Sequence, residues 1–216
     1  MRALRRPATV AFILVALLII AAGAALLVRP LYRDARAWWV LNVFAPEWTP
    51  AGQMPIERLA SPYYHRRLSR VDTLVIHTTE GALASAIGWF RRNPDEVSAH
   101  YLIGKDGRIV QMVDERFAAQ HAGEVTAPAD TRWHEGNPNE YSIGIELEND
   151  AEIDDPADLT PAQGAALWAL AKDIVSRQHI PVDRQHIVGH SEIDPLNRND
   201  PGPGFPWEEF MRELGE

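Results

Sequence analysis

The chain has 216 residues, 46% of them hydrophobic and 24% charged, which is typical of one globular domain and excludes a fibrous or disordered chain. The formal net charge is -9, and because residues 1–36 hold six Arg and one Asp (a net +5), the remainder carries -14 and would repel nucleic acid. No cysteine is present, so any metal must bind to His, Asp or Glu, and disulfides and thiolate nucleophiles are excluded.

A long apolar run follows the basic N-terminal residues 1–7. Residues 8–28 are 21 consecutive positions without a charge, and about 20 such residues are needed to cross the hydrocarbon core of a membrane. We therefore expect a transmembrane anchor at 8–28. A cleaved signal peptide is the alternative, because the small residues Ala21–Ala25 could be accepted by a peptidase. Arginines flank the run on both sides, so the positive-inside rule does not fix its orientation.

The segment 29–60 is predicted to be a juxtamembrane linker. It contains Trp38-Trp39, which suits the interface of a membrane, and several prolines without a strong hydrophobic period. We expect one folded domain at 61–216.

Strand and helix patterns alternate in the first half of this domain. Residues 72–77 are predicted to form a buried strand, because their apolar core is too short for a helix. A helix is predicted at 82–92, ended by Asn93-Pro94. The segments 100–103 and 108–113 flank the sequence Gly-Lys-Asp-Gly, and such a spacer between two apolar runs indicates a β-hairpin.

The second half continues the alternation. Residues 142–148 are predicted to form a strand whose apolar residues alternate with glycine and two acids. Thr160-Pro161-Ala162-Gln163 is a helix start signal, so we predict a helix that runs to about Gln178. A short strand at 185–189 leads into a loop rich in proline and glycine that ends at Trp207. Together these elements predict an α/β domain with a mixed β-sheet and helices packed on its faces.

Two histidines lie at the C-terminal ends of predicted strands, where open α/β sheets build their sites. His77 closes the strand at 72–77, His190 follows the strand at 185–189, and Asp200 comes ten residues later in the loop. Two imidazoles and one carboxylate would leave a fourth zinc position open for water, as hydrolytic sites require. From spacing alone this set is a hypothesis. Four other histidines are expected to be ordinary surface or core residues: His65, His134, His179 and His186.

Charged side chains that could assist such a metal lie close by in the sequence. Glu146 and Glu148 face one side of an otherwise apolar strand, so either could take a proton from an attacking water. A solvated face at a sheet edge would explain both acids equally well. Arg198 lies two residues before Asp200 and either stabilises a developing oxyanion or is a surface loop arginine.

Five segments of the chain occur in the order that they have in a known family. They are LVIHTTEG, SAHYLIGKDGRIVQMV, QHAG, SIGIELEND and VGHSEIDPLNRNDPGPGFPW. Together they resemble the type 2 N-acetylmuramoyl-L-alanine amidases, which are relatives of the peptidoglycan recognition proteins and of phage lysozyme-type amidases. The resemblance extends over residues 61–207, almost the whole predicted domain.

This resemblance implies a single zinc ion per chain, bound in a surface groove by His77, His190 and Asp200. It assigns the catalytic acid–base role to Glu146 rather than to Glu148. Arg198 stands where many members of the family have Lys, and we expect its guanidinium to present a positive charge to the oxyanion.

Two further histidines match segments of the family. His121, in QHAG, is expected to face the groove and to contact the muropeptide substrate. His100, in SAHY, is expected to support the sheet.

The predicted function is zinc-dependent hydrolysis of the amide bond between N-acetylmuramic acid and L-alanine in peptidoglycan or muropeptides. The enzyme would be held by residues 8–28 in a bacterial inner membrane, with its domain on the extracytoplasmic side, where peptidoglycan lies. One alternative is a recognition module that binds peptidoglycan without cutting it, which would be expected to lack a ligand or Glu146. Another is an enzyme specialised for small anhydro-muropeptides. The sequence does not identify any protein partner.

Overall fold

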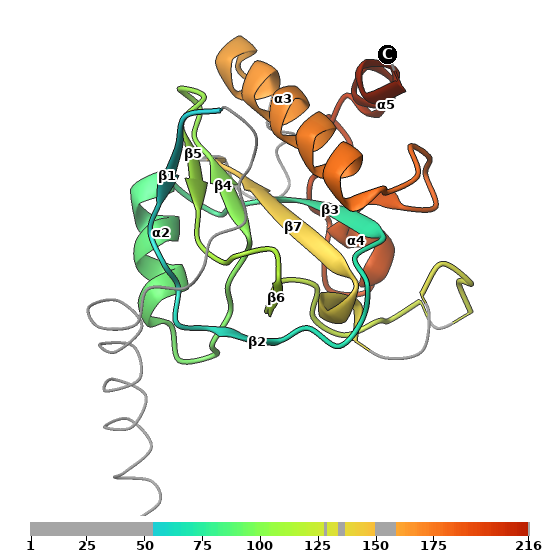
Figure 1. Cartoon of the computed structure of the whole chain (residues 1–216), viewed down its shortest axis with the longest axis horizontal. Helices are drawn as coiled ribbons and strands as arrows, with labels where there is room; N and C mark the ends of the chain where they lie inside the picture. Colours follow the sequence, from blue (N-terminus) through green and yellow to red (C-terminus); the bar gives the residue numbers. More distant parts are fainter. Residues whose placement is uncertain (1–53, 128, 134–136, 150–158, 216) are drawn as a thin grey trace, which may run out of the picture. The chain divides into compact units, whose positions relative to one another are not determined.

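The computed structural model of the chain describes residues 54–127, 129–133, 137–149 and 159–215 (Figure 1). The predicted anchor at 8–28 and most of the predicted linker at 29–60 lie outside these residues. Within the described part of the chain, no helix combines the length and the apolar character that crossing a membrane requires.

A six-stranded sheet forms the centre of the described domain. Its strands are β1 (Ile56–Arg58), β3 (Thr73–Thr78), β4 (Tyr101–Ile103), β5 (Ile109–Gln111), β7 (Ser142–Leu147) and β8 (Ile187–Gly189). They lie in the order β1-β5-β4-β7-β3-β8, and all neighbours are parallel except β4 and β5. The predicted hairpin and the mixed sheet are thereby confirmed.

Three short strands were not predicted. β1 pairs with β5, so the sheet begins before Ser61, where we expected the domain to start. β2 (Tyr64–Arg66) and β6 (Phe117–Ala119) form a separate two-stranded antiparallel sheet. Each of these strands has three residues, which is too short for an alternating pattern to be recognised in a sequence.

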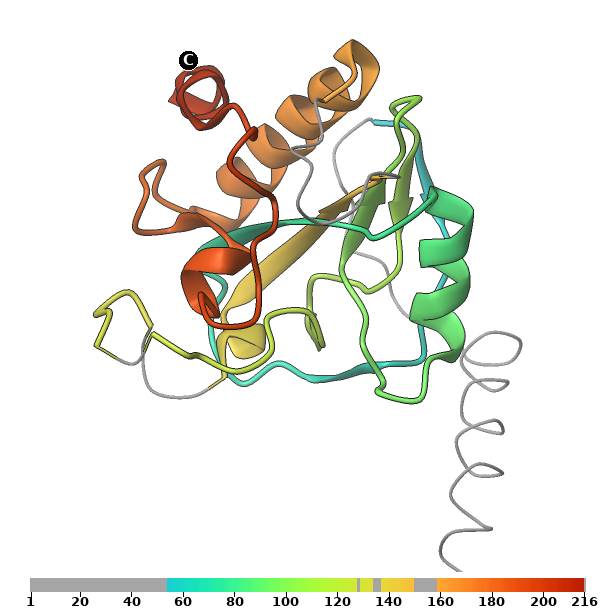
Figure 2. The same ribbon diagram turned by 180° about the vertical axis from the view of Figure 1, so that it is seen from behind.

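Helices cover both faces of the main sheet (Figures 1 and 2). On one face, α3 (Pro161–Gln178) and α5 (Trp207–Gly215) enclose the larger hydrophobic core. On the other face, α2 (Leu83–Arg92) packs over β4 and β5. The helices predicted from 82 and 161 are confirmed, whereas α5 begins at the residue where we expected a loop to end.

The central strands send alternate side chains to the two faces. Ile76 of β3 and Ile145 of β7 join the core under α3, while Val75 of β3 lies in a smaller cluster on the opposite side. Because β7 lies between β4 and β3, it is buried on both faces. The possibility that Glu146 and Glu148 mark a solvated sheet edge is therefore wrong.

The start of α3 follows the sequence signal. Oγ1 of Thr160 accepts a hydrogen bond from the backbone N–H of Gln163 at 3.1 Å, and Pro161 occupies the first helical position. The hydroxyl of Thr160 also donates to the carbonyl of Lys105 in the turn between β4 and β5. One threonine thus both caps the helix and joins it to the hairpin.

Candidate metal centre

Three neighbouring parallel strands bring their C-terminal ends to one edge of the sheet. His77 of β3 is the Cα partner of Glu146 of β7, and Ile76 of β3 is the partner of Gly189 of β8. His190, the next residue after Gly189, therefore starts beside His77. It is the first residue of the one-turn helix α4 (His190–Ile193). The segment expected to be a loop rich in proline and glycine thus begins with one turn of helix.

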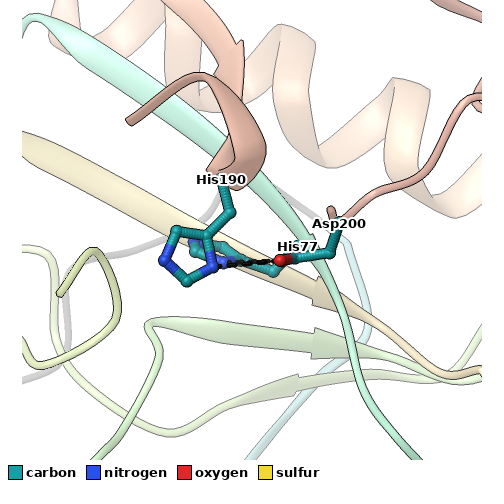
Figure 3. Close-up of side chains that lie close together, drawn as sticks. All are labelled: His77, His190 and Asp200. Atoms are coloured by element: carbon teal, nitrogen blue, oxygen red, sulfur yellow. Dashed lines mark hydrogen bonds and ion pairs between the residues drawn. The ribbon is translucent and has the colours of Figure 1, made fainter. Parts of the chain in front are cut away.

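The side chains of His77, His190 and Asp200 point toward one another (Figure 3). The carboxylate of Asp200 lies 3.2 Å from Nδ1 of His77 and 3.2 Å from Nδ1 of His190. One possible ligand atom from each residue lies within 4.8 Å of the others, and no second cluster of this kind occurs among the residues that the structure describes. The structure therefore brings the three predicted ligands together.

The loop that carries Asp200 is tied to the end of β8. The carbonyl of Asp200 accepts a hydrogen bond from the backbone N–H of Ser191 at 2.9 Å. A Cβ atom at position 189 would lie 2.7 Å from Cδ of Pro201, so the loop can approach this closely only because residue 189 is glycine. The ring of Trp207, at the start of α5, lies 3.5 Å from the guanidinium of Arg184 and packs beside this loop.

The protonation states of these residues suit a divalent cation. Burial and the neighbouring His190 lower the pKa of His77 to about 4, so the ring is neutral at pH 7 and has a free lone pair. Burial alone would raise the pKa of Asp200, but hydrogen bonds that its carboxylate accepts from His190 and His77 outweigh burial and hold this pKa below its usual range. Two imidazoles and an ionised carboxylate form a donor set that zinc prefers, so the residues fit this metal.

Glu146 lies next to the ligands, and only 9% of the residue is exposed. Burial raises its pKa to about 8, with a further rise from the negative charge of Asp200 and a partial offset from Arg198. A carboxyl group whose pKa lies near neutrality can both take up and return a proton during a reaction. The position of Glu146 therefore suits an acid–base residue.

Glu148 has a different role from Glu146. Its two carboxylate oxygens accept hydrogen bonds at 2.7 Å from the backbone N–H groups of Leu83 and Lys105. Leu83 is the first residue of α2, and Lys105 lies in the turn of the hairpin. The carboxylate therefore satisfies backbone donors and joins these two elements.

Arg198 is exposed on the loop between α4 and Asp200. Its charge lowers the pKa values of both Glu146 and His77, so its guanidinium lies within electrostatic reach of the centre. It also lines a pocket of about 460 Å³ together with other residues of this loop. None of the three ligands lines that pocket, so it is distinct from the metal centre.

His121 is buried, with 5% of the residue exposed. Its Nδ1 lies 3.0 Å from Nε2 of His77, and its Nε2 lies 3.2 Å from Oγ of Ser142. The structure thus places His121 in contact with His77, the first candidate ligand. Its expected contact with a muropeptide substrate stays a prediction. His100 is fully buried and accepts a hydrogen bond from the backbone N–H of Gly144 at 3.0 Å, in keeping with its expected support of the sheet.

Arg67 was missed in the sequence because it sits in an ordinary-looking basic stretch. Its guanidinium donates to five backbone carbonyls, those of Glu115, Phe117, Asn139, Glu140 and Ser142. Burial lowers its pKa to about 10, which leaves it charged at pH 7. It therefore holds β6, β7 and the segment between them together beneath the centre.

Comparisons with known proteins agree on one family. The sequence profile described as N-acetylmuramoyl-L-alanine amidase matches residues 67–203. The chain is similar to N-acetylmuramoyl-L-alanine amidase AmiD of Escherichia coli (strain K12), with 38% identity over 157 residues that cover 67% of this chain and 53% of AmiD. It is also similar to N-acetylmuramoyl-L-alanine amidase A of Achromobacter lyticus, with 32% identity over 181 residues that cover 76% of this chain and 89% of the relative.

A solved structure of AmiD supports the same relation. It is a complex with the substrate anhydro-N-acetylmuramic acid-L-Ala-D-gamma-Glu-L-Lys, and it matches the fold with a TM-score of 0.58 and 34% identity. The match covers 67% of this chain and 58% of that one. This chain thus spans little more than half the length of AmiD.

Proposed function

This chain belongs to the N-acetylmuramoyl-L-alanine amidase family, and from that premise we propose that it hydrolyses the bond between N-acetylmuramic acid and L-alanine with the help of one zinc ion. The observation that carries the proposal is the convergence of His77, His190 and Asp200 beside the buried carboxyl of Glu146. Peptidoglycan and the muropeptides derived from it both contain this bond.

The residues of the centre divide the chemistry among them. His77, His190 and Asp200 would hold the ion, which when bound polarises the amide carbonyl and lowers the pKa of a water molecule. Glu146 takes a proton from the attacking water as the carbon–oxygen bond forms. It returns that proton to the nitrogen of L-alanine as the carbon–nitrogen bond breaks, which leaves a free carboxylate and a free amine. Arg198 presents positive charge to the oxyanion formed in between.

A recognition module that binds without cutting is the competing function. It would be expected to lack a metal ligand or the acid–base residue. This chain has three candidate ligands and, beside them, Glu146. The choice between polymeric peptidoglycan and anhydro-muropeptides is a separate question. The bound substrate named for the AmiD structure makes an anhydro-muropeptide the first small substrate to try.

The decisive experiment measures zinc content and amidase activity together. We expect the full chain to bind about one zinc ion and to release peptides with a free L-alanine amine from peptidoglycan or from anhydro-muropeptides. Glu146→Gln should keep the metal and lose activity by roughly 10²- to 10⁴-fold, the usual contribution of an acid–base residue. His190→Ala should lose the metal as well. A parent that binds zinc and cuts neither substrate would favour the recognition module.

The proposed location of the enzyme rests on the sequence. Residues 8–28 are long enough and apolar enough to span a membrane, and peptidoglycan lies outside the cytoplasm of bacteria. We infer a single-pass anchor with the amidase domain on the outer side. Added protease should therefore digest the domain in spheroplasts, and washing with high salt should leave the chain in the membrane fraction. Digestion only after lysis would contradict this orientation.

A further inference from the structure

We propose that His121 is a positioning residue that fixes which nitrogen of His77 faces the metal. The inference rests on the proposed metal centre and adds a residue that binds neither metal nor substrate. The ring of His77 has a polar contact at each nitrogen. Nδ1 lies 3.2 Å from the carboxylate of Asp200, and Nε2 lies 3.0 Å from Nδ1 of His121. The two imidazole rings are nearly perpendicular, at 88°.

The direction of each hydrogen bond follows from counting protons. In the zinc-loaded protein, Nδ1 of His77 can bind the cation only without a proton, so it no longer donates to Asp200 and the proton of the neutral ring must be on Nε2. Nε2–H of His77 then donates to Nδ1 of His121, which must itself be bare. The proton of the His121 ring is consequently on Nε2.

The remaining contacts accept this direction without conflict. Nε2–H of His121 can donate to Oγ of Ser142 at 3.2 Å, and the hydroxyl of Ser142 donates to the carbonyl of Pro138 at 2.7 Å. His77, His121 and Ser142 thus form a row in which each side chain donates one hydrogen bond to the next group. The row ends on the carbonyl of Pro138, which only accepts. The row from Pro138 to His77 thus favours the tautomer of His77 that leaves Nδ1 free for the metal.

The ring of His121 is also fixed in place. A Cβ atom at position 144 would lie 2.6 Å from the ring, so the side chain packs directly on the backbone of β7 at Gly144. The backbone N–H groups of His121 and Ala122 both donate to Oδ1 of Asn139, at 2.9 and 2.8 Å. Asn139 is itself buried. Hydrogen bonds to Asn139 therefore fix the backbone at His121, and packing on Gly144 fixes its ring where it contacts His77.

The tautomer can be observed directly in the zinc-loaded full chain. Long-range ¹H–¹⁵N correlation NMR distinguishes a ring protonated at Nε2 from one protonated at Nδ1. We expect His121 and His77 to be protonated at Nε2. A His121 ring that carries its proton on Nδ1 overturns the inference even if zinc is bound and the enzyme is active.

A matched pair of variants tests the same contact through metal affinity. His121→Asn places a side-chain oxygen near the position of Nδ1 and can still accept from His77, whereas the longer amide in His121→Gln reaches toward Ser142. We expect the Gln variant to bind zinc roughly 10- to 100-fold more weakly in competition with a chelator, as is usual when a ligand loses its outer hydrogen-bond partner. The Asn variant should stay within a few-fold of the parent.

The outcomes separate this inference from the proposed function. Equal weakening in both variants, or no weakening in either, overturns the positioning role. Thermal unfolding of the metal-free variants is the control, because similar midpoints show that the affinity difference is not a folding defect. A parent that binds no zinc overturns the metal centre itself, whereas a parent that binds zinc with the other tautomer overturns only the role of His121.

Discussion

Glu146 stands apart from the other acids of the chain because burial, more than any charged neighbour, sets its pKa. Its ordinary value of 4.5 rises to about 8 in the folded protein without metal. The folded protein therefore binds more protons than the unfolded chain between these two values, and the free energy of unfolding falls as pH rises through this window. The burial that suits the proposed acid–base role of Glu146 therefore costs stability at higher pH.

A comparison of the metal-free parent with metal-free Glu146→Gln isolates this effect. Glutamine cannot ionise, so we expect the variant to be more stable than the parent at pH 8.5, by on the order of a few kcal/mol. Near pH 4 the carboxyl is mostly neutral in both the folded and the unfolded parent. The difference in the free energy of unfolding should therefore shrink to the part that does not depend on ionisation. Urea unfolding of both proteins at the two pH values measures it. A stability difference that is independent of pH would contradict the raised pKa.

At the scale of residues, the candidate ligands could be predicted from the sequence, but the contact of His121 with His77 could not. His77, His190 and Asp200 were predicted from their places after strands and from the family resemblance, and the structure brings them together. The contact of His121 with His77 depends on how the ring of His121 packs on Gly144. No local pattern encodes such a contact, because its two residues come from different segments and meet only through the tertiary fold.

At the scale of elements, Glu148 links the start of α2 to the turn of the hairpin. Glu148→Ala removes an acceptor from the N–H groups of Leu83 and Lys105. We expect the free energy of unfolding to fall by about 2 kcal/mol, since two partly buried donors lose their partner. Zinc content and the rate per folded molecule should stay as in the parent.

This result would be the reverse of that for Glu146→Gln, which should lose rate without losing stability. Denaturant titration and metal analysis of the two variants side by side test the division of roles. Loss of zinc in Glu148→Ala would place Glu148 in the metal centre instead.

The elements that could be predicted are those with a long pattern or a clear start signal. β3, β7, α2 and α3 were expected close to their observed bounds. α5 was missed because it begins one residue after Pro206, at the end of a segment that its prolines and glycines marked as a loop. Proline just before a helix is compatible with its first turn, so this composition concealed a start signal.

At the scale of the whole molecule, the candidate metal centre joins three parts of the fold. His77 ends β3, His190 begins α4, and Asp200 lies in the loop that α5 and Gly189 hold in place. An ion that binds only when these parts are assembled stabilises the folded state by mass action. The unfolded chain has no such arrangement of ligands.

Removal of the metal should therefore lower the thermal midpoint of the whole domain. With zinc at about 1,000 times its dissociation constant the stabilisation is about 4 kcal/mol, which corresponds to roughly 8–16 °C for a domain of this size. Calorimetry with and without a chelator measures the shift. His190→Ala is the control and should melt at the same temperature in both conditions. A shift of equal size in that variant would show that the stabilising ion binds elsewhere.

The order of the ligands along the chain also has a consequence during biosynthesis. A growing polypeptide that has been made as far as α3 contains β3 and β7, and so holds His77 and Glu146, but neither His190 nor Asp200. His77 and Glu146 are therefore translated before α3, and His190 and Asp200 are translated after it. A nascent or prematurely terminated chain of that length lacks two of the three candidate ligands, so the proposed metal centre cannot form until synthesis has passed Asp200.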